Sequence, residues 1–129
     1  MAVLGIGLDI VELDRIERIH ARHGDAFIRK ICRQGEVQPR VGKALIQHLG
    51  GLFAAKEAGL KALGTGWAEG LGLSQIEVAR RPSGAPFLRL HRAAADRAEA
   101  LGVTQTHLTI SHERHYAVAF VILEGSSSC

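Results

Sequence analysis

The sequence has 129 residues, of which 47% are hydrophobic and 22% are charged, and its formal net charge is +3. This length suits one domain with its own core, and the composition excludes a disordered chain. No stretch is apolar enough for a membrane span, no basic segment opens a signal peptide, and two cysteines (Cys32 and Cys129) provide no disulfide framework. We therefore expect a cytoplasmic protein without a membrane partner, with a single domain over residues 1–125, a frayed tail over 126–129 and an anionic partner.

Residues 3–11 alternate apolar side chains with glycine or a carboxylate, which predicts a strand. The alternation predicts that one face of this strand points to the core, namely Leu4, Ile6, Leu8 and Ile10. The opposite face carries Gly5, Gly7 and Asp9, so it can admit a ligand or another backbone very closely. Asp9 either merely ends a tightly packed strand or serves a ligand, and the rarity of Asp in strands favours the ligand.

Residues 14–24 predict a short helix capped by Asp14 and ended by Gly24, and Asp25 is predicted to cap a second short helix over residues 26–32. Three arginines recur on the first helix at intervals of three and four residues and form one basic row: Arg15, Arg18 and Arg22. Such a row is usually solvated surface. Without a matching acidic row it can also pair with the carboxylates or phosphates of an acidic partner.

A central helix is predicted over residues 53–64, because good helix formers dominate and Gly64 provides a stop. A weaker helix over residues 36–49, interrupted at Pro39 and Gly42, leads into it, and the pattern does not decide between one helix and two. The central helix is apolar nearly all round and should be buried. Its charges, Lys56, Glu57 and Lys61, either reach solvent and pair with each other or belong to a site.

The second half of the sequence predicts strands at 75–79 and 87–90, a helix at 91–101, and strands at 106–112 and 116–123. The last strand is apolar on both faces and should be central in its sheet. This order predicts an α+β fold in which an antiparallel sheet packs against a long central helix and shorter helices. The Gly-rich stretch 64–72 predicts a loop whose N–H groups could bind an anion.

Polar residues interrupt the apolar pattern at Asp9, at Glu57 with its lysines, and at Ser111-His112. Two carboxylates on rigid elements suit magnesium, which takes one or two carboxylates together with substrate phosphates. Lysines would neutralise the remaining phosphate charge. The histidines show no zinc-ligand spacing. Ser111 and His112 are strand neighbours and point to opposite faces, so they are not a nucleophile–base pair.

Three stretches occur together in this order: Gly5-Ile6-Gly7-Leu8-Asp9-Ile10-Val11-Glu12, then Phe53-Ala54-Ala55-Lys56-Glu57-Ala58 with Lys61-Ala62-Leu63-Gly64-Thr65-Gly66, and Ile110-Ser111-His112 with Tyr116-Ala117. The combination resembles the holo-acyl-carrier-protein synthases, the bacterial 4′-phosphopantetheinyl transferases of fatty-acid synthesis, over nearly the whole chain. The resemblance implies the fold of that family and a homotrimer with active sites between subunits. It also implies magnesium-dependent transfer of 4′-phosphopantetheine from coenzyme A to a serine of apo-acyl carrier protein, with release of adenosine 3′,5′-bisphosphate.

The resemblance also implies residue roles. Asp9 and Glu57 would hold magnesium, and Glu57 would accept the serine proton directly or through a water. Lys61 would stabilise charge on the phosphoanhydride, and His112 would contact a phosphate near the reacting phosphorus. The residues expected to bind the coenzyme are Lys56, Lys61, Gly64, Thr65, Gly66, Ser111 and His112. Those expected to dock the acidic carrier protein are Arg15, Arg18 and Arg22.

Leu52 departs from the family pattern, because the family commonly has an arginine there. One expected coenzyme phosphate contact would therefore be missing or pass to Lys43 or Arg40. Glu113 stands where the family usually has aspartate. Two alternatives stay open: a non-catalytic basic module for acidic carrier protein or nucleic acid, and a family member that has lost coenzyme binding. Aromatic residues make up only 5% of the chain, so base-stacking platforms are scarce and we expect no nucleic-acid partner.

Overall fold

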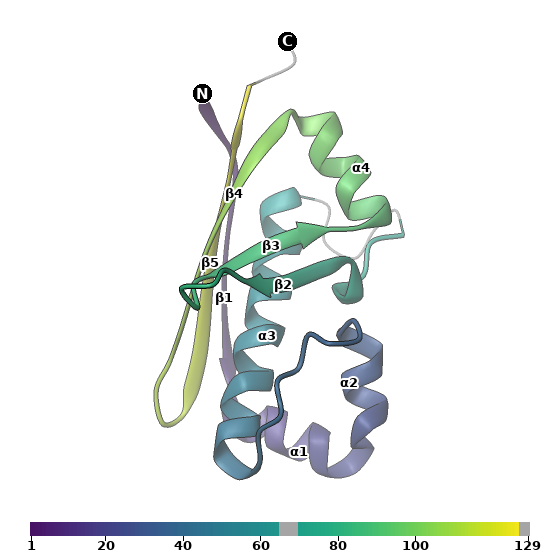
Figure 1. Ribbon diagram of the computed structural model, residues 1–129, viewed down its shortest axis with the longest axis vertical. Coiled ribbons are helices and arrows are strands. Elements are labelled where there is room, and N and C mark those ends of the chain that lie inside the picture. The colour runs from purple at the N-terminus through teal and green to yellow at the C-terminus, as the bar shows by residue number, and fades with distance from the viewer. Residues whose placement is uncertain (65–69, 127–129) are drawn as a thin grey trace.

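The structure is a computed structural model that describes residues 1–64 and 70–126. A three-stranded antiparallel sheet with the order β1–β5–β4 is covered on one face by the long helix α3 (Figure 1). The strands are β1 (Ala2–Glu12), β4 (Val103–His112) and β5 (Tyr116–Gly125), and α3 spans Gly42–Leu63. The predicted α+β fold and the central position of the last strand are confirmed. Residues 127–129 of the expected tail lie outside the described residues.

The register of the sheet places the candidate strand residues on opposite edges. Asp9 of β1 is opposite Ala119 of β5, which is opposite Ile110 of β4. Two residues beyond Asp9, Val11 of β1 is opposite Ala117 of β5, which is opposite His112 of β4. Directly opposed residues share a face, so Asp9 and His112 both point to the face that α3 covers. Two strand spacings, about 10 Å, separate the two edges.

The prediction for the face of β1 was wrong. Ile6, Leu8 and Ile10 lie on the outer face of the sheet and are 61%, 57% and 63% exposed. The face toward α3 carries Gly5 and Gly7 instead, because a Cβ on either residue would overlap a backbone carbonyl of α3. Figure 1 shows the helices on one side of the sheet, so the outer apolar face has no cover within the described chain. Period-two alternation identifies the strand but not which side the core occupies.

Helix α3 is continuous, which settles the question left open by the sequence. It runs from Gly42 through Gly50 and Gly51 to Leu63, and Gly64 closes it with φ 81°. The weaker helix predicted from residue 36 was wrong over residues 36–41, which are not helical. The two internal glycines are fully packed, and a Cβ at Gly50 would overlap the side chain of Leu13. Their cost in helix propensity is therefore offset by close packing.

The N-caps of the two short helices lie two residues and one residue before the predicted caps, Asp14 and Asp25. Helix α1 (Leu13–His23) follows Glu12 at the N-cap, so Asp14 lies in the first turn and makes no capping hydrogen bond. Helix α2 (Asp25–Ile31) follows Gly24, whose φ of 55° confirms it as the helix stop. Asp14 still lies near the positive end of the α1 dipole, which favours its charge.

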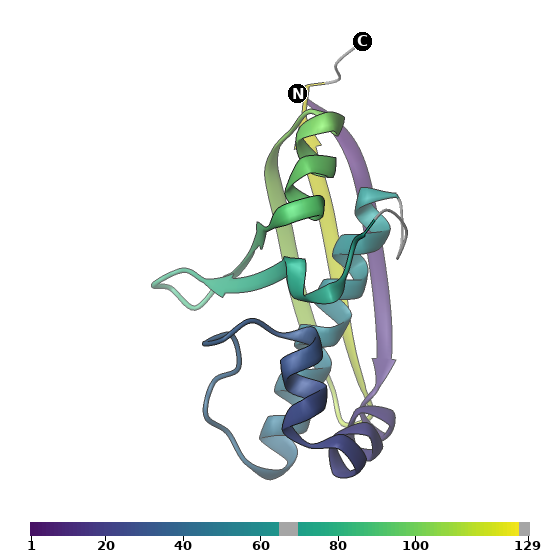
Figure 2. The same ribbon diagram turned by 90° about the vertical axis from the view of Figure 1, so that its right-hand side faces the viewer.

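A second layer packs against α3 on the side away from the sheet. It consists of the short helix η1 (Leu73–Gln75), the hairpin of β2 (Ile76–Arg80) and β3 (Pro86–Leu90), and helix α4 (Arg92–Leu101). The two strands and α4 lie within one residue of the predicted boundaries, whereas η1 was not predicted. Figure 2 shows the tip of the hairpin projecting away from the sheet. Among the described residues, no helix has both the length and the apolar character that a membrane crossing requires.

Candidate active site

Asp9 and Glu57 lie close together where β1 passes along α3. Gly7 permits this approach, because a Cβ there would overlap the carbonyl oxygen of Ala58, the residue next to Glu57. Burial raises the pKa of Glu57, and the negative charge of Asp9 raises it further. The Gly-x-Asp spacing thus brings one carboxylate from the strand against a second from the helix.

Lys61 completes this cluster from the next turn of α3. Its ammonium donates hydrogen bonds to Asp9 Oδ1 and to the carbonyl oxygen of Leu8, each at 3.0 Å. The Lys61 side chain is 55% exposed and that of Asp9 is 16% exposed. Lys61 and Glu57 are four residues apart and share a helix face, and the charge of Lys61 partly opposes the rise in the pKa of Glu57. We call Asp9, Glu57 and Lys61 the acidic cluster, after its two carboxylates.

The acidic cluster suits a hard cation shared with a ligand. Among the described residues, no group of three or more His, Cys, Asp or Glu side chains gathers around a possible metal position. Two carboxylates alone do not complete a protein-built cage. They do match magnesium, which keeps waters and takes further oxygens from phosphates. The mutual repulsion that raises the pKa of Glu57 would be relieved by such a cation.

Lys56 does not belong to this cluster, and the expectation that it binds a coenzyme phosphate is corrected. Its ammonium is fully buried on the other side of α3 and lies 2.7 Å from Glu36 Oε2. It also donates to the carbonyl oxygens of Leu73 and Ile76 at 3.3 and 2.7 Å. These partners satisfy the donors of the ammonium, so Lys56 binds the second layer instead of a ligand.

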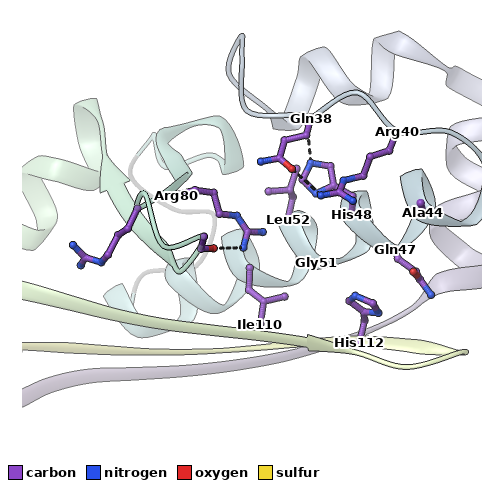
Figure 3. A pocket seen from close by; sticks show the side chains of 12 residues that line it. Gln38, Arg40, Ala44, Gln47, His48, Gly51, Leu52, Arg80, Ile110 and His112 are labelled. Atoms are coloured by element: carbon purple, nitrogen blue, oxygen red, sulfur yellow. Dashed lines mark hydrogen bonds between the residues drawn. The ribbon is translucent and has the colours of Figure 1, made fainter.

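Ser111 and His112 lie at the opposite edge of the sheet from the acidic cluster. Both are exposed, and Ser111 is on the outer face, so the two side chains diverge as predicted. His112 points toward α3 and borders a cavity of about 550 Å³ (Figure 3). Helix α3 lies between this cavity and Asp9. A single chain therefore does not bring His112 to the acidic cluster.

The other predicted site residues are placed as follows. Gly64 is exposed at the end of α3, where Arg97 Nε donates to the carbonyl oxygen of Leu63 at 3.0 Å. Thr65 and Gly66 lie outside the described residues. The arginine row of α1 is exposed at Arg15, Arg18 and Arg22. Arg15 also lies near enough to Glu57 for its charge to lower the pKa of that carboxyl.

Comparison with known proteins now places the chain in a family. Residues 5–121 match the 4′-phosphopantetheinyl transferase superfamily. The chain belongs to this family. It is 49% identical over 123 residues to a holo-acyl-carrier-protein synthase of Nitratidesulfovibrio vulgaris, covering 95% of this chain and 99% of the relative. It is 50% identical over 122 residues to one of Halorhodospira halophila, covering 94% and 97%.

Solved structures of holo-acyl-carrier-protein synthases share the fold. The Neisseria meningitidis enzyme superposes with a TM-score of 0.85 at 34% identity, covering 95% of this chain and 99% of that one. The Bacillus anthracis enzyme, described as a complex with coenzyme A (3′,5′-ADP), gives a TM-score of 0.79 at 36% identity, covering 96% and 98%. The family resemblance read from the three motifs is confirmed.

Sequence reasoning missed several polar residues of this family member. Glu36 is buried against Lys56, and the only signal for it was that a buried lysine requires a partner. Gln38, His48 and Arg80 border the cavity beside His112. Arg80 was not singled out by the sequence, since nothing in a local pattern shows that the hairpin folds back to α3.

Proposed function

We propose that this protein is a holo-acyl-carrier-protein synthase that transfers 4′-phosphopantetheine from coenzyme A to a serine of apo-acyl carrier protein. The products are holo-acyl carrier protein and adenosine 3′,5′-bisphosphate, and the pathway served is fatty-acid biosynthesis in the cytoplasm. One observation carries the proposal: the acidic cluster of Asp9, Glu57 and Lys61 forms in a chain that matches such enzymes over almost their whole length.

In this reaction the serine oxygen attacks the phosphorus that bears the pantetheine arm. A new P–O bond forms, the P–O bond to the bridging oxygen of the pyrophosphate breaks, and adenosine 3′,5′-bisphosphate leaves. Glu57 accepts the serine proton, directly or through one water. Lys61, held toward the cluster by Asp9, stabilises the charge that develops on the phosphate oxygens.

Magnesium fits the two carboxylates of the cluster. Asp9 and Glu57 would hold it, and when bound it supplies charge neutralisation for the pyrophosphate of coenzyme A. The closeness of Asp9 to Glu57 supports this assignment, because two carboxylates close together favour a cation between them.

The nucleotide half of coenzyme A binds in the cavity beside His112, with Gly64, Thr65, Gly66 and Ser111 as further boundaries of the coenzyme site. Coenzyme A must span this cavity and the acidic cluster, which lie at opposite edges of one sheet. A homotrimer with sites between subunits resolves the separation, because the edge of one copy then meets the opposite edge of the next. The exposed apolar face of Ile6, Leu8 and Ile10 supplies the surface for such an assembly.

The arginine row of Arg15, Arg18 and Arg22 docks the acidic carrier protein. Its position supports this role, since Arg15, one end of the exposed row, lies near enough to Glu57 for its charge to act on that carboxyl. A partner docked on the row would therefore have its serine close to the cluster. Guanidinium groups pair well with carboxylates. The alternative of a non-catalytic basic module uses the same row but leaves the acidic cluster without a purpose.

The test is an intact-mass measurement of an apo-acyl carrier protein incubated with the enzyme, coenzyme A and magnesium. We expect the carrier to gain the mass of one phosphopantetheine group and adenosine 3′,5′-bisphosphate to appear in equal amount. A carrier whose serine is replaced by alanine is the matched control and should gain nothing. If carrier proteins bind but none gains mass, the protein is the non-catalytic module instead.

A further inference from the structure

Helix α1 begins without a side-chain cap. Glu12 occupies its N-cap and makes no capping hydrogen bond, so the N–H groups of the first turn need other acceptors. The N–H of Leu13, the first residue of the helix, donates to the carbonyl oxygen of His115 at 2.8 Å. His115 lies in the turn that joins β4 to β5 over residues 113–115, at the end of the sheet where α1 begins (Figure 1). The β4–β5 turn therefore supplies an acceptor that the sequence of α1 lacks.

Glu113 closes this turn with both its side chain and its backbone. Its Oε1 accepts the N–H of His115 and, at 2.9 Å, the N–H of Tyr116. Its own N–H donates to the carbonyl oxygen of Tyr116 at 2.9 Å. The hydrogen bonds from His115 and Tyr116 lower the pKa of Glu113, so the carboxylate that accepts them is ionised at neutral pH. Because His115 donates to Glu113 and accepts from Leu13, the carboxylate fixes the same residue that anchors α1.

The anchored end of α1 is also the end that lies near the acidic cluster. Arg15 follows Leu13 by two residues, and its charge acts on the carboxyl of Glu57. Leu13 is buried and packs so closely on α3 that a Cβ at Gly50 would overlap its side chain. A small movement of the first turn of α1 would therefore change where the arginine row stands relative to the cluster.

Side-chain packing leaves space between α1 and the turn. A cavity of about 280 Å³ lies where α1, the first turns of α3 and the β4–β5 turn meet. Lys43 borders this cavity and not the one beside His112. Among the described residues, a single hydrogen bond joins α1 to the turn, from Leu13 to His115. The position of α1 thus depends on how firmly the turn itself is held.

We propose that Glu113 is a positioning residue that holds α1 in place for the docking of the acidic carrier protein. The inference rests on the proposed function and gives a role to a residue that the chemistry of the acidic cluster does not require. Glu113 acts in two steps: its carboxylate fixes the β4–β5 turn, and the turn fixes the first residue of α1. The arginine row then meets the carrier protein at a set distance from the cluster.

The coenzyme side of the reaction should not depend on Glu113. His112, the residue before it, is paired with Ala117 in the β4–β5 ladder and is therefore held by the sheet. Asp9 and Lys61 bind each other away from the turn, at 3.0 Å. Loss of the Glu113 carboxylate should therefore affect one substrate and spare the other.

The experiment measures the KM for carrier protein, the KM for coenzyme A and kcat for the wild type, Glu113→Ala and Glu113→Asp. Glu113→Ala should raise the KM for carrier protein by about 3- to 10-fold, the range for a lost hydrogen bond, while the other two values stay within about twofold. Removal of a negative charge alone would have the opposite effect, because it favours an acidic partner. Glu113→Asp should keep the wild-type KM, since an aspartate in a turn also accepts the N–H two residues on. Glu99→Ala removes an exposed carboxylate of α4 and should change none of these values.

Calorimetry and amide hydrogen exchange separate this inference from the proposed function. In a titration without coenzyme A, the Kd for carrier protein should rise in Glu113→Ala by the same factor as the KM, whether or not the carrier is ever modified. The Leu13 amide, followed by NMR, should exchange faster in Glu113→Ala than in the wild type and Glu113→Asp, while the amides of α3 keep their wild-type rates.

The outcomes of these measurements are distinct. A carrier protein that binds but gains no mass would remove the proposed function, and the Kd values would still decide the role of Glu113. A carrier protein that gains mass with an unchanged KM in Glu113→Ala would leave the function standing and overturn the inference. Equal increases in both KM values, or a Glu113→Asp variant that behaves like Glu113→Ala, would overturn it as well.

Discussion

Two lysines on α3 lie five residues apart and have opposite environments. Lys56 is fully buried against Glu36, whereas the Lys61 side chain is 55% exposed beside Asp9. Five residues turn a helix by about 140°, so the two ammonium groups leave it toward different layers. One therefore stabilises the packing of α3, and the other lies in the exposed acidic cluster.

His48 should make stability depend on pH. Its folded-state pKa, about 4, is below the value of 6.5 expected in the unfolded chain. The unfolded chain binds the proton more readily, so the contribution of neutral His48 to stability is complete above about pH 6.5 and is lost as the pH falls toward 4. The backbone N–H of Gln38 donates to His48 Nε2 at 3.0 Å, and His48→Gln keeps an acceptor for this N–H but cannot titrate.

The measurement for His48 is the free energy of unfolding in urea at about pH 7 and about pH 4.5. The wild type should lose more stability between these values than His48→Gln. His23→Gln, an exposed histidine on α1, is the control and should follow the wild type. An identical loss in the wild type and His48→Gln would show that His48 is not held neutral.

At the scale of elements, the Glu36–Lys56 pair joins α3 to the second layer. Glu36 also accepts the N–H groups of Arg33 and Val78 at 2.9 and 2.8 Å, so the pair connects the loop after α2 with β2. Lys56→Met would leave the carboxylate without its counter-ion and should cost about 3–5 kcal/mol of unfolding free energy.

The double variant Glu36→Gln/Lys56→Met should be more stable than the sum of the two single losses predicts, because no unpaired charge remains. Lys61→Met, with its exposed side chain, should cost less than about 1 kcal/mol. Urea unfolding curves give all of these values. Strict additivity of the Glu36 and Lys56 variants would mean that the pair is not coupled.

The basic row of α1 can be tested apart from the acidic cluster, because only Arg15 lies close enough to influence Glu57. Arg18→Glu/Arg22→Glu should raise the KM for carrier protein by about tenfold or more through charge repulsion. The KM for coenzyme A should stay near that of the wild type. Arg89→Glu, on the hairpin, controls for the change in net charge. Equal increases in both KM values would mean that the row is not the docking surface.

The sequence predicted the existence of nearly every element but not how β1 faces its neighbours. Alternation at Ile6, Leu8 and Ile10 indicates a strand whichever of its faces is buried. From the sequence alone, an apolar face is taken to be the face that packs into the core. Here the face toward the core is made of glycines, because α3 lies too close for any side chain. The sequence indicated interruptions at Pro39 and Gly42 and did not decide between one helix and two. The helix instead begins at Gly42 and continues through Gly50 and Gly51, because packing of Gly50 against Leu13 overrides the low helix propensity of glycine.

Part of the candidate site was predictable from the spacing of residues within single motifs and from the family resemblance. The family resemblance implied that Asp9 and Glu57 belong to one site, and the four-residue spacing predicted that Glu57 and Lys61 share a helix face. The hydrogen bond from Lys61 to Asp9 was not predicted. The burial of Lys56 and the arrival of Arg80 at the cavity depend on how separate layers pack. A local pattern contains no information on that packing.

At the scale of the whole molecule, the outer face of the sheet predicts self-association. Leu8 is 57% exposed and lies opposite Phe120, which is 37% exposed, so apolar surface continues across two strands. Leu8→Glu should convert the expected trimer to smaller species and reduce turnover, since the coenzyme site would lose its second subunit. Sedimentation velocity measures the change.

Val41→Glu is the matched control for Leu8→Glu, because Val41 is 84% exposed but lies outside the sheet. This variant should sediment like the wild type. A monomeric wild type with full activity would contradict the shared site. So would a Leu8→Glu variant that keeps the assembly of the wild type.

The central claim is that phosphopantetheine transfer takes place at the acidic cluster, and the rate of transfer by Glu57→Gln tests it most directly. The amide keeps the shape of the side chain but cannot accept the serine proton or balance a cation. We predict that kcat falls about a hundredfold or more while the thermal unfolding temperature stays close to that of the wild type. Glu99→Gln, an exposed residue of α4, should retain full activity. Turnover by Glu57→Gln within about twofold of the wild type would contradict the account.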